Sequence, residues 1–126
     1  MKLVLDAGAL VAVERGHSKL VALIKRERLA GRPPRTHGGV IGQVWRGGTG
    51  RQAVLARALA SVDVVPLDNE LGKRAGVLLG QAGTKDVIDA AVVLLAVDND
   101  RIFTSDPDDL RPLAVAAGTH VEIIPV

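Results

Sequence analysis

Four aspartates, in three separate stretches of the sequence, have the positions needed to form one metal site. Asp6 and Asp106 each follow a short apolar run that is typical of a buried strand. Asp86 and Asp89 lie three residues apart at the start of an apolar stretch, and this spacing places both on one face of a helix. Ligands of open parallel sheets bind just beyond the carboxyl ends of the strands. The four carboxylates are therefore expected to converge at that edge.

Such a cluster of like charges requires a cation. Two carboxylates about 4 Å apart repel each other by roughly 4 kcal/mol even at an effective dielectric constant near 20. The sequence contains no cysteine, so a thiolate zinc site is excluded. Hard oxygen ligands favour Mg²⁺ or Mn²⁺, which keep bound water and engage substrate phosphates. We therefore expect Asp6, Asp86, Asp89 and Asp106 to be the metal ligands.

Each aspartate taken alone also has a purely structural interpretation. Asp6 and Asp106 can cap the helices that follow them, and Asp86 can interact favourably with a helix dipole. Asp89 can be a solvated or capping group. Only their convergence at one place separates the metal-site hypothesis from these alternatives.

The elements that must position the aspartates alternate between strand and helix. Strands are predicted at 3–5, weakly around 35–36, and at 62–67, 102–104 and 121–124. A first helix is predicted up to the Gly31-Arg32-Pro33-Pro34 stretch, with others at 40–45, ending at Gly47-Gly48, and at 52–59, 71–79 and 86–97. Thr84 is expected to cap the 86–97 helix, and Pro107 to start a short one. This alternation indicates an α/β fold with a mainly parallel sheet of about five strands.

The 126 residues predict a single domain, 1–126, with a core of Val, Leu, Ile and Ala, since Phe103 and Trp45 are the only aromatic residues. No apolar run approaches the roughly 20 residues of a membrane span, and Asp6 interrupts the N-terminal apolar run. We expect a soluble protein in the cytoplasm with no membrane partner. The charges are segregated, because basic residues crowd 25–35 while aspartates gather late in the chain. This pattern is compatible with a phosphate-binding surface beside an acidic pocket.

Four segments, in this order and spacing, resemble PIN-domain ribonucleases, and most closely the VapC-type toxins of toxin–antitoxin systems. These segments are LVLDAGALVAVERG, VIGQVWRGG, GTKDVIDAAVVLLA and IFTSDPDDL, and the resemblance covers essentially the whole chain. It implies a five-stranded parallel sheet in the order 3-2-1-4-5 and an acidic Mg²⁺ or Mn²⁺ site. It also implies an endoribonuclease that cleaves structured RNA, a VapB-like antitoxin partner and a homodimer.

The resemblance assigns roles residue by residue. Asp6, Asp86 and Asp106 match the first, third and fourth acids of the family and are the expected catalytic residues. Asp89 matches an additional acid of some relatives. Gln43 stands where the family usually has its second acid, a glutamate, so it brings no charge and cannot act as a base.

Several other residues are expected to assist the site. Gly8 takes the place of a frequent Ser or Thr, so one hydroxyl is lost, and Thr104 and Ser105 are expected to supply hydrogen bonds. Arg46, and the basic cluster at 25–35, are expected to bind RNA phosphates. His17, His37 and His120 have no metal-ligand spacing and are expected in surface or loop positions. Trp45 is expected in the core or an interface rather than stacked on a base.

The expected chemistry is metal-assisted hydrolysis of a phosphodiester, with one or two ions about 3.5–4 Å apart if both bind. Antitoxin binding is expected to place an arginine in the acidic pocket and an apolar helix near Trp45. A catalytically weak or inactive PIN-fold module that binds RNA or a protein is the alternative, because of Gln43. A phosphotransfer domain is disfavoured, since no acid stands two residues after Asp6.

Overall fold

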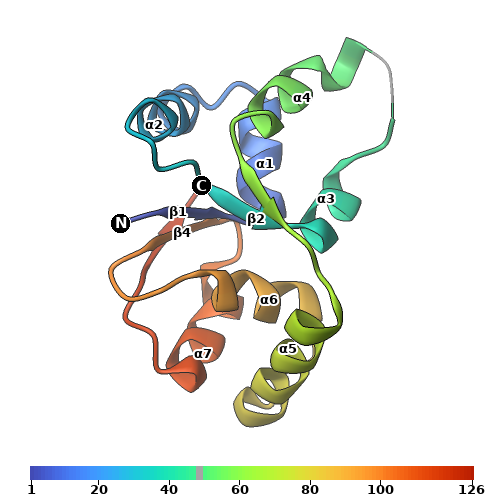
Figure 1. Ribbon diagram of the computed structural model, residues 1–126, viewed down its shortest axis with the longest axis vertical. Helices are drawn as coiled ribbons and strands as arrows, with labels where there is room; N and C mark the ends of the chain where they lie inside the picture. Colours follow the sequence, from blue (N-terminus) through green and yellow to red (C-terminus); the bar gives the residue numbers. More distant parts are fainter. Residues whose placement is uncertain (48–49) are drawn as a thin grey trace.

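Five parallel strands form the centre of the fold (Figure 1). The computed structural model describes residues 1–47 and 50–126. The strands are β1 (Leu3–Leu5), β2 (Arg35–His37), β3 (Asp63–Val65), β4 (Arg101–Thr104) and β5 (Glu122–Pro125). Their order in the sheet is β3-β2-β1-β4-β5, and every pair is parallel. The predicted α/β class and the order 3-2-1-4-5 are therefore confirmed.

Helices cover both faces of the sheet, as Figure 1 shows. On one side lie α1 (Ala7–Glu14), α2 (Ser18–Leu29) and α4 (Ala53–Leu59), the last preceded by a 3₁₀ turn (Gly50–Gln52). On the other side lie α5 (Asn69–Ala82), α6 (Val87–Leu95) and α7 (Pro107–Ala117), and α3 (Gly38–Val44) follows β2 near the sheet edge. Burial on both faces explains why β1 is a continuous apolar run.

The first predicted helix is in fact two helices. Apolar residues recur at helical spacing through 20–29, but α1 ends at Glu14 and α2 begins at Ser18. Gly16 adopts a left-handed conformation (φ 83°) at the break, and the His17 side chain caps α2 by accepting from the Leu20 amide. The break lets α2 lie across α1 instead of extending it.

The start of α6 also differs from the prediction. Thr84 was expected to cap this helix with Asp86 inside its first turn, but Asp86 is itself the N-cap, and its Oδ1 accepts from the Asp89 amide at 3.0 Å. The Thr84 hydroxyl is buried without a hydrogen-bond partner in the part of the chain that the structure describes. A carboxylate is as good a cap as a hydroxyl and also suits the positive end of the helix dipole.

Other observed element boundaries differ from the predicted ones by a few residues. The third strand is shorter than the predicted 62–67, and α5 begins two residues earlier than expected, because Asp68 accepts from the Leu71 amide and caps it. The helix after Pro107 is longer than the short one expected. Of the predicted Gly47-Gly48 breaker, Gly47 adopts a positive φ of 100°, and Gly48 lies outside the described residues.

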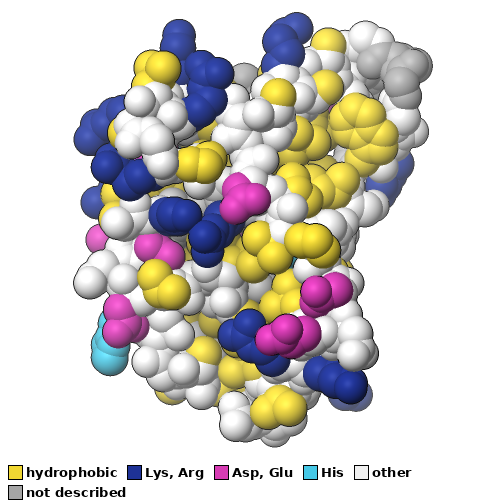
Figure 2. Space-filling model, in the orientation of Figure 1, with side chains coloured by type: hydrophobic (Ala, Val, Ile, Leu, Met, Phe, Trp, Pro, Cys, Tyr) yellow, Lys and Arg dark blue, Asp and Glu magenta, His cyan; other side chains and the backbone are white. Residues whose placement is uncertain are grey.

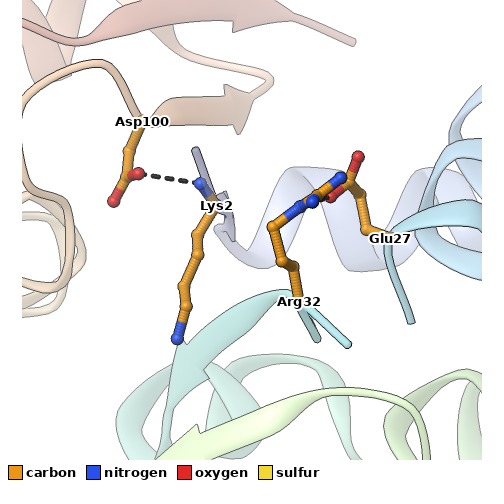
Figure 3. A network of polar contacts seen from close by, with 4 residues as sticks. All are labelled: Lys2, Glu27, Arg32 and Asp100. Atoms are coloured by element: carbon orange, nitrogen blue, oxygen red, sulfur yellow. Dashed lines mark hydrogen bonds and ion pairs between the residues drawn. The ribbon is translucent and has the colours of Figure 1, made fainter. Parts of the chain in front are cut away.

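Polar contacts stabilise the segments that lead into the strands, at the amino ends of β1, β2 and β4 (Figure 3). The Lys2 amide donates to Asp100 Oδ1 at 2.8 Å. The buried Glu27 accepts from Arg32 Nε at 2.8 Å, and this hydrogen bond and charge hold the pKa of Glu27 below its ordinary value. Arg32 is therefore committed to a structural ion pair where the chain passes from α2 to β2.

Buried apolar side chains from both helical layers form one cluster around β1 and β4. Ala90, Ala91, Val92 and Val93 of α6 are completely buried, as the apolar pattern of that helix predicted. Phe103 is buried, whereas the Trp45 side chain is 39% exposed beyond the end of α3. In the described part of the chain, every helix is too short or too polar to cross a bilayer.

Candidate functional site

The carboxyl ends of β1 and β4 and the start of α6 surround a hollow of about 320 Å³ that is rich in acidic side chains. Its lining includes the four aspartates that sequence analysis selected, together with a fifth: Asp6, Asp86, Asp89, Asp106 and Asp109. Gln43 and Arg46 line the same hollow. We refer to it as the acidic cleft. Carboxylates from three distant segments thus meet at the edge where open parallel sheets bind their ligands.

Asp109 was not selected by sequence analysis. It lies in the first turn of α7, three residues after Asp106. Asp86 and Asp89 have the same spacing, with the first acid at an N-cap and the second in the first turn. That repeated spacing was the available signal.

Asp6 is the most buried member of the cleft. It is the N-cap of α1, its Oδ1 accepts from the Ala9 amide at 2.9 Å, and its exposed fraction is 7%. Burial raises the pKa of Asp6 above its ordinary value, and the charge of Asp106 raises it further. The Thr104 hydroxyl and the Ala9 amide oppose this shift by stabilising the ionised form. The capping interpretation of Asp6 is therefore correct, and it coexists with a place in the acidic cleft.

The pKa of Asp89 is raised by the charges of all the other acids of the cleft. Partial burial and the charges of Asp86, Asp6, Asp109 and Asp106, in that order, raise its pKa to about 6. A carboxyl group with this pKa is ionised at neutral pH but unfavourably placed. A cation in the cleft would relieve that repulsion.

Asp106 begins α7 without capping it through its side chain. Its amide donates to the Thr104 hydroxyl oxygen at 2.9 Å, and the Ser105 hydroxyl donates to its Oδ2 at 3.4 Å. The Thr104 hydroxyl oxygen accepts a hydrogen bond from the Asp106 amide, so the Thr104 hydroxyl proton remains free to be donated to the Asp6 carboxylate. Thr104 thereby links Asp6 and Asp106.

Gly8 leaves space that Ser105 occupies. A Cβ added to Gly8 would lie 2.1 Å from Ser105 Oγ and 2.5 Å from Ser105 Cβ. The Ser105 side chain thus fills the space beside Gly8, and Ser105 lines the same cleft.

Gln43 and Arg46 stand at the rim, on and just after α3. The Gln43 side chain is exposed. Arg46 Nη1 donates to the carbonyl groups of Trp45 at 2.8 Å and Gly42 at 3.1 Å, which holds the guanidinium beside the helix end. Gln52, which sequence analysis missed, fixes this turn, since its Oε1 accepts from the amides of Arg46 and Gly47 while its Nε2 donates to Val44.

His37 was expected on the surface, and that expectation is wrong, because its side chain is completely buried. Its Nδ1 accepts from the Gly39 amide at 3.1 Å, which caps α3, and its Nε2 lies 3.0 Å from the Ile88 carbonyl of α6. This pairing requires the neutral ring with the proton on Nε2. Burial lowers the pKa of His37, in agreement with a neutral ring. His37 therefore connects the helix of Gln43 with that of Asp86 and Asp89.

The other two histidines, His17 and His120, are exposed as expected. The basic stretch at 25–35 does not line the acidic cleft. Lys25 and Arg28 line a separate hollow between α2 and α4, and Arg35 begins β2 at the opposite edge of the sheet. Figure 2 shows many of the Lys and Arg side chains of that face gathered over α2.

The donor chemistry of the cleft fits a hard divalent cation, because the acidic side chains offer only oxygen. Among residues 1–47 and 50–126, no three acidic or imidazole side chains stand close enough together to hold one ion. A carboxylate has about four acceptor positions, so capping a helix amide does not prevent Asp6 or Asp86 from binding a cation as well.

Comparisons of the chain with protein-family models and with curated proteins find no match.

Proposed function

We propose that this protein is a Mg²⁺- or Mn²⁺-dependent ribonuclease that hydrolyses phosphodiester bonds, and that it acts as the VapC-like toxin of a toxin–antitoxin pair in the cytoplasm. The observation that carries the enzymatic part is the meeting of five carboxylates from three segments in one cleft, with Arg46 at its rim. The resemblance of four sequence segments to PIN-domain toxins supports the toxin part.

Asp6, Asp86, Asp89 and Asp106 would hold the metal. A divalent ion bound there supplies an activated water and neutralises charge on the phosphoryl oxygens. The other roles in the reaction are performed by side chains of the protein. Thr104 holds Asp6 and the start of α7 in register. Gln43 orients water through its amide, and Arg46 binds a non-bridging phosphate oxygen of the RNA.

The test compares the wild-type protein with Asp6→Asn and Asp106→Asn. Asparagine is a good N-cap, so Asp6→Asn preserves α1 while removing the charge. We expect both variants to lose Mg²⁺- or Mn²⁺-dependent RNA cleavage and to keep the wild-type thermal unfolding temperature, or to exceed it, in EDTA. We also expect Mg²⁺ to raise the unfolding temperature of the wild type more than that of either variant. Full cleavage by both variants would exclude the proposed site.

A second candidate function is a PIN-fold module that binds RNA or a protein without cleaving it. Two observations favour it: Gln43 adds no charge to the cleft, and among the described residues no three acids of the cleft are close enough together to hold one ion. Such a module would bind RNA with no turnover, and Mg²⁺ would not stabilise it. RNA turnover together with Mg²⁺-linked stabilisation would exclude this alternative.

A further inference from the structure

A stripe of residues along α1 continues the acidic cleft toward the far end of that helix. Gly8, Val11, Ala12 and Arg15 share one face, because they follow the i, i+3, i+4, i+7 spacing. All four line a hollow of about 560 Å³. Gly8 and Ser105 line both this hollow and the acidic cleft, so the two are adjacent.

A second hollow lies beside the same stretch of α1. It has a volume of about 570 Å³ and shares Gln43 and Arg46 with the acidic cleft. It shares Val11 and Arg15 with the first hollow. The three hollows therefore form one continuous depression, which we call the α1 groove where it lies outside the acidic cleft.

The α1 groove has an apolar floor and a cation at its far end. Half-buried Val11 and Ala12 form the floor, and Glu14 lines the part of the groove nearest Arg46. The exposed Arg15 stands about 10 Å along the helix axis from Gly8. Among the described residues, the ion pairs join other side chains, and Arg15 takes part in none of them. Arg15 and Arg46 line one hollow together and thus offer positive charge beside the acidic cleft.

This arrangement matches an RNA strand better than a basic peptide. A guanidinium group binds phosphate with two parallel hydrogen bonds, while apolar side chains can pack against the face of a base. A base is free to lie on Val11 and Ala12 only where the RNA is single-stranded, since a duplex stacks its bases inside. Arg15 and Arg46 repel an arginine-rich peptide, whereas the divalent ion of the proposed function would offset the repulsion between the carboxylates and RNA phosphates.

We infer that the α1 groove binds single-stranded RNA next to the scissile phosphodiester, with Arg15 holding a backbone phosphate and Val11 and Ala12 supporting a base. This inference rests on the proposed ribonuclease function. Arg15 is a positioning residue, because it lies away from the acids that would act on the reacting phosphate.

The test measures binding of a short fluorescein-labelled oligouridylate by fluorescence anisotropy in EDTA, where cleavage cannot occur. We expect Arg15→Gln to weaken binding by roughly tenfold, the scale of one charge-assisted contact. The slope of log K against log salt should fall by about 0.7, as expected for one lost phosphate contact on a single strand. Arg15→Lys should retain most of the salt slope. The matched control is Arg74→Gln, which removes an exposed charge from α5 on the other side of the sheet and should change neither quantity.

Three outcomes would overturn the inference: equal losses for Arg15→Gln and Arg74→Gln, no loss for Arg15→Gln, or an equal loss on a labelled RNA duplex. Cleavage assays on the same proteins distinguish this failure from failure of the proposed function. RNA cleavage without Arg15-dependent binding refutes the α1 groove alone. Arg15-dependent binding without any metal-dependent cleavage refutes the nuclease and retains the groove as an RNA site.

Discussion

At the scale of single residues, the raised pKa of Asp89 makes the protein sensitive to pH. Its pKa is about 6 in the folded protein against 3.8 as a reference, so the folded state binds more protons between these values. The metal-free protein should therefore lose stability as pH rises from about 4 to about 6, and then show no further loss from this group. Mg²⁺-linked stabilisation should grow over the same window, because the ion competes with the proton.

Thermal unfolding in EDTA and in Mg²⁺, across this pH range, measures the effect. Asp89→Asn should flatten the metal-free profile and raise stability at neutral pH. Asp108→Asn is the matched control, because Asp108 is an exposed acid of α7 that does not line the cleft. A profile that keeps its slope in Asp89→Asn would assign the pH dependence to another group.

Gln43 lines the rim of the acidic cleft, so its replacement by an acid would add negative charge to the cleft. Gln43→Glu should tighten Mg²⁺ binding and lower the metal concentration needed for cleavage. It should also slightly destabilise the metal-free protein, because it adds a sixth carboxylate beside the five. Calorimetric titration with Mg²⁺ checks this, with Gln81→Glu on the exposed face of α5 as the control. An affinity that does not change would place Gln43 outside the reach of the ion.

At the scale of elements, one buried histidine holds the two helices of the site together. His37 caps α3 and pairs with Ile88 of α6. Gly39 allows this approach, since a Cβ there would lie 2.5 Å from Ile88 Cδ1 and 2.9 Å from His37 Cε1. Asparagine would preserve the cap but is too short to reach Ile88. We expect His37→Asn to cost about 1–3 kcal/mol of unfolding free energy through the lost bond and the space left behind.

His17→Asn is a matched control, because His17 also caps a helix but is exposed. The His17→Asn variant should lose no more than about 0.5 kcal/mol of unfolding free energy. The lowered pKa of His37 means that the unfolded chain takes up a proton first as pH falls below 6.5, so the wild type should lose stability in that direction. The His37→Asn variant should lose less stability over the same fall in pH. Denaturant unfolding at neutral and mildly acidic pH compares the two, and equal costs for both variants would deny His37 this connecting role.

The parallel sheet and the position of the acids could be predicted because both depend on patterns that are local in sequence, whereas the strand order was implied only by the resemblance to PIN domains. Continuous apolar runs marked β1 and β4, and the acids after them fell at one edge. The break at Gly16 and the burial of His37 could not be predicted in this way. Apolar spacing continues across the break, and the partner of His37 lies 51 residues away. Thr84 and Asp86 are both good caps, and only the course of the chain decides between them.

At the scale of the whole molecule, acidic and basic surfaces occupy different ends of the sheet. The acids meet at the carboxyl ends of the strands, and many of the Lys and Arg side chains gather over α2 (Figure 2). An antitoxin that silences the proposed enzyme is expected to place an arginine among Asp6, Asp86 and Asp106, because a guanidinium group offers fixed donors and a permanent charge. An apolar segment of the partner should cover the exposed side of Trp45.

Co-expression with the product of the adjacent gene, followed by pull-down, tests this expectation. Binding should weaken with rising Mg²⁺ and in the Asp6→Asn/Asp106→Asn double variant, and RNA should compete with it. Inhibition that responds to neither change would place the antitoxin on another surface. The absence of any bound partner would count against the toxin proposal while leaving the nuclease proposal intact.

The contact between Gly8 and Ser105 also limits the order in which this protein can change during evolution. A side chain at Gly8 cannot be accommodated while Ser105 keeps its own, because the two would occupy the same space. Replacement of Ser105 by glycine removes the side-chain clash but leaves the backbone nitrogen of residue 105 at 2.9 Å from the added Cβ, so the backbone must shift as well, and the intermediate lacks a hydroxyl at both positions. A lineage that exchanges one arrangement for the other must pass through a sequence with a less well-supported cleft. The two positions are consequently expected to change together or not at all.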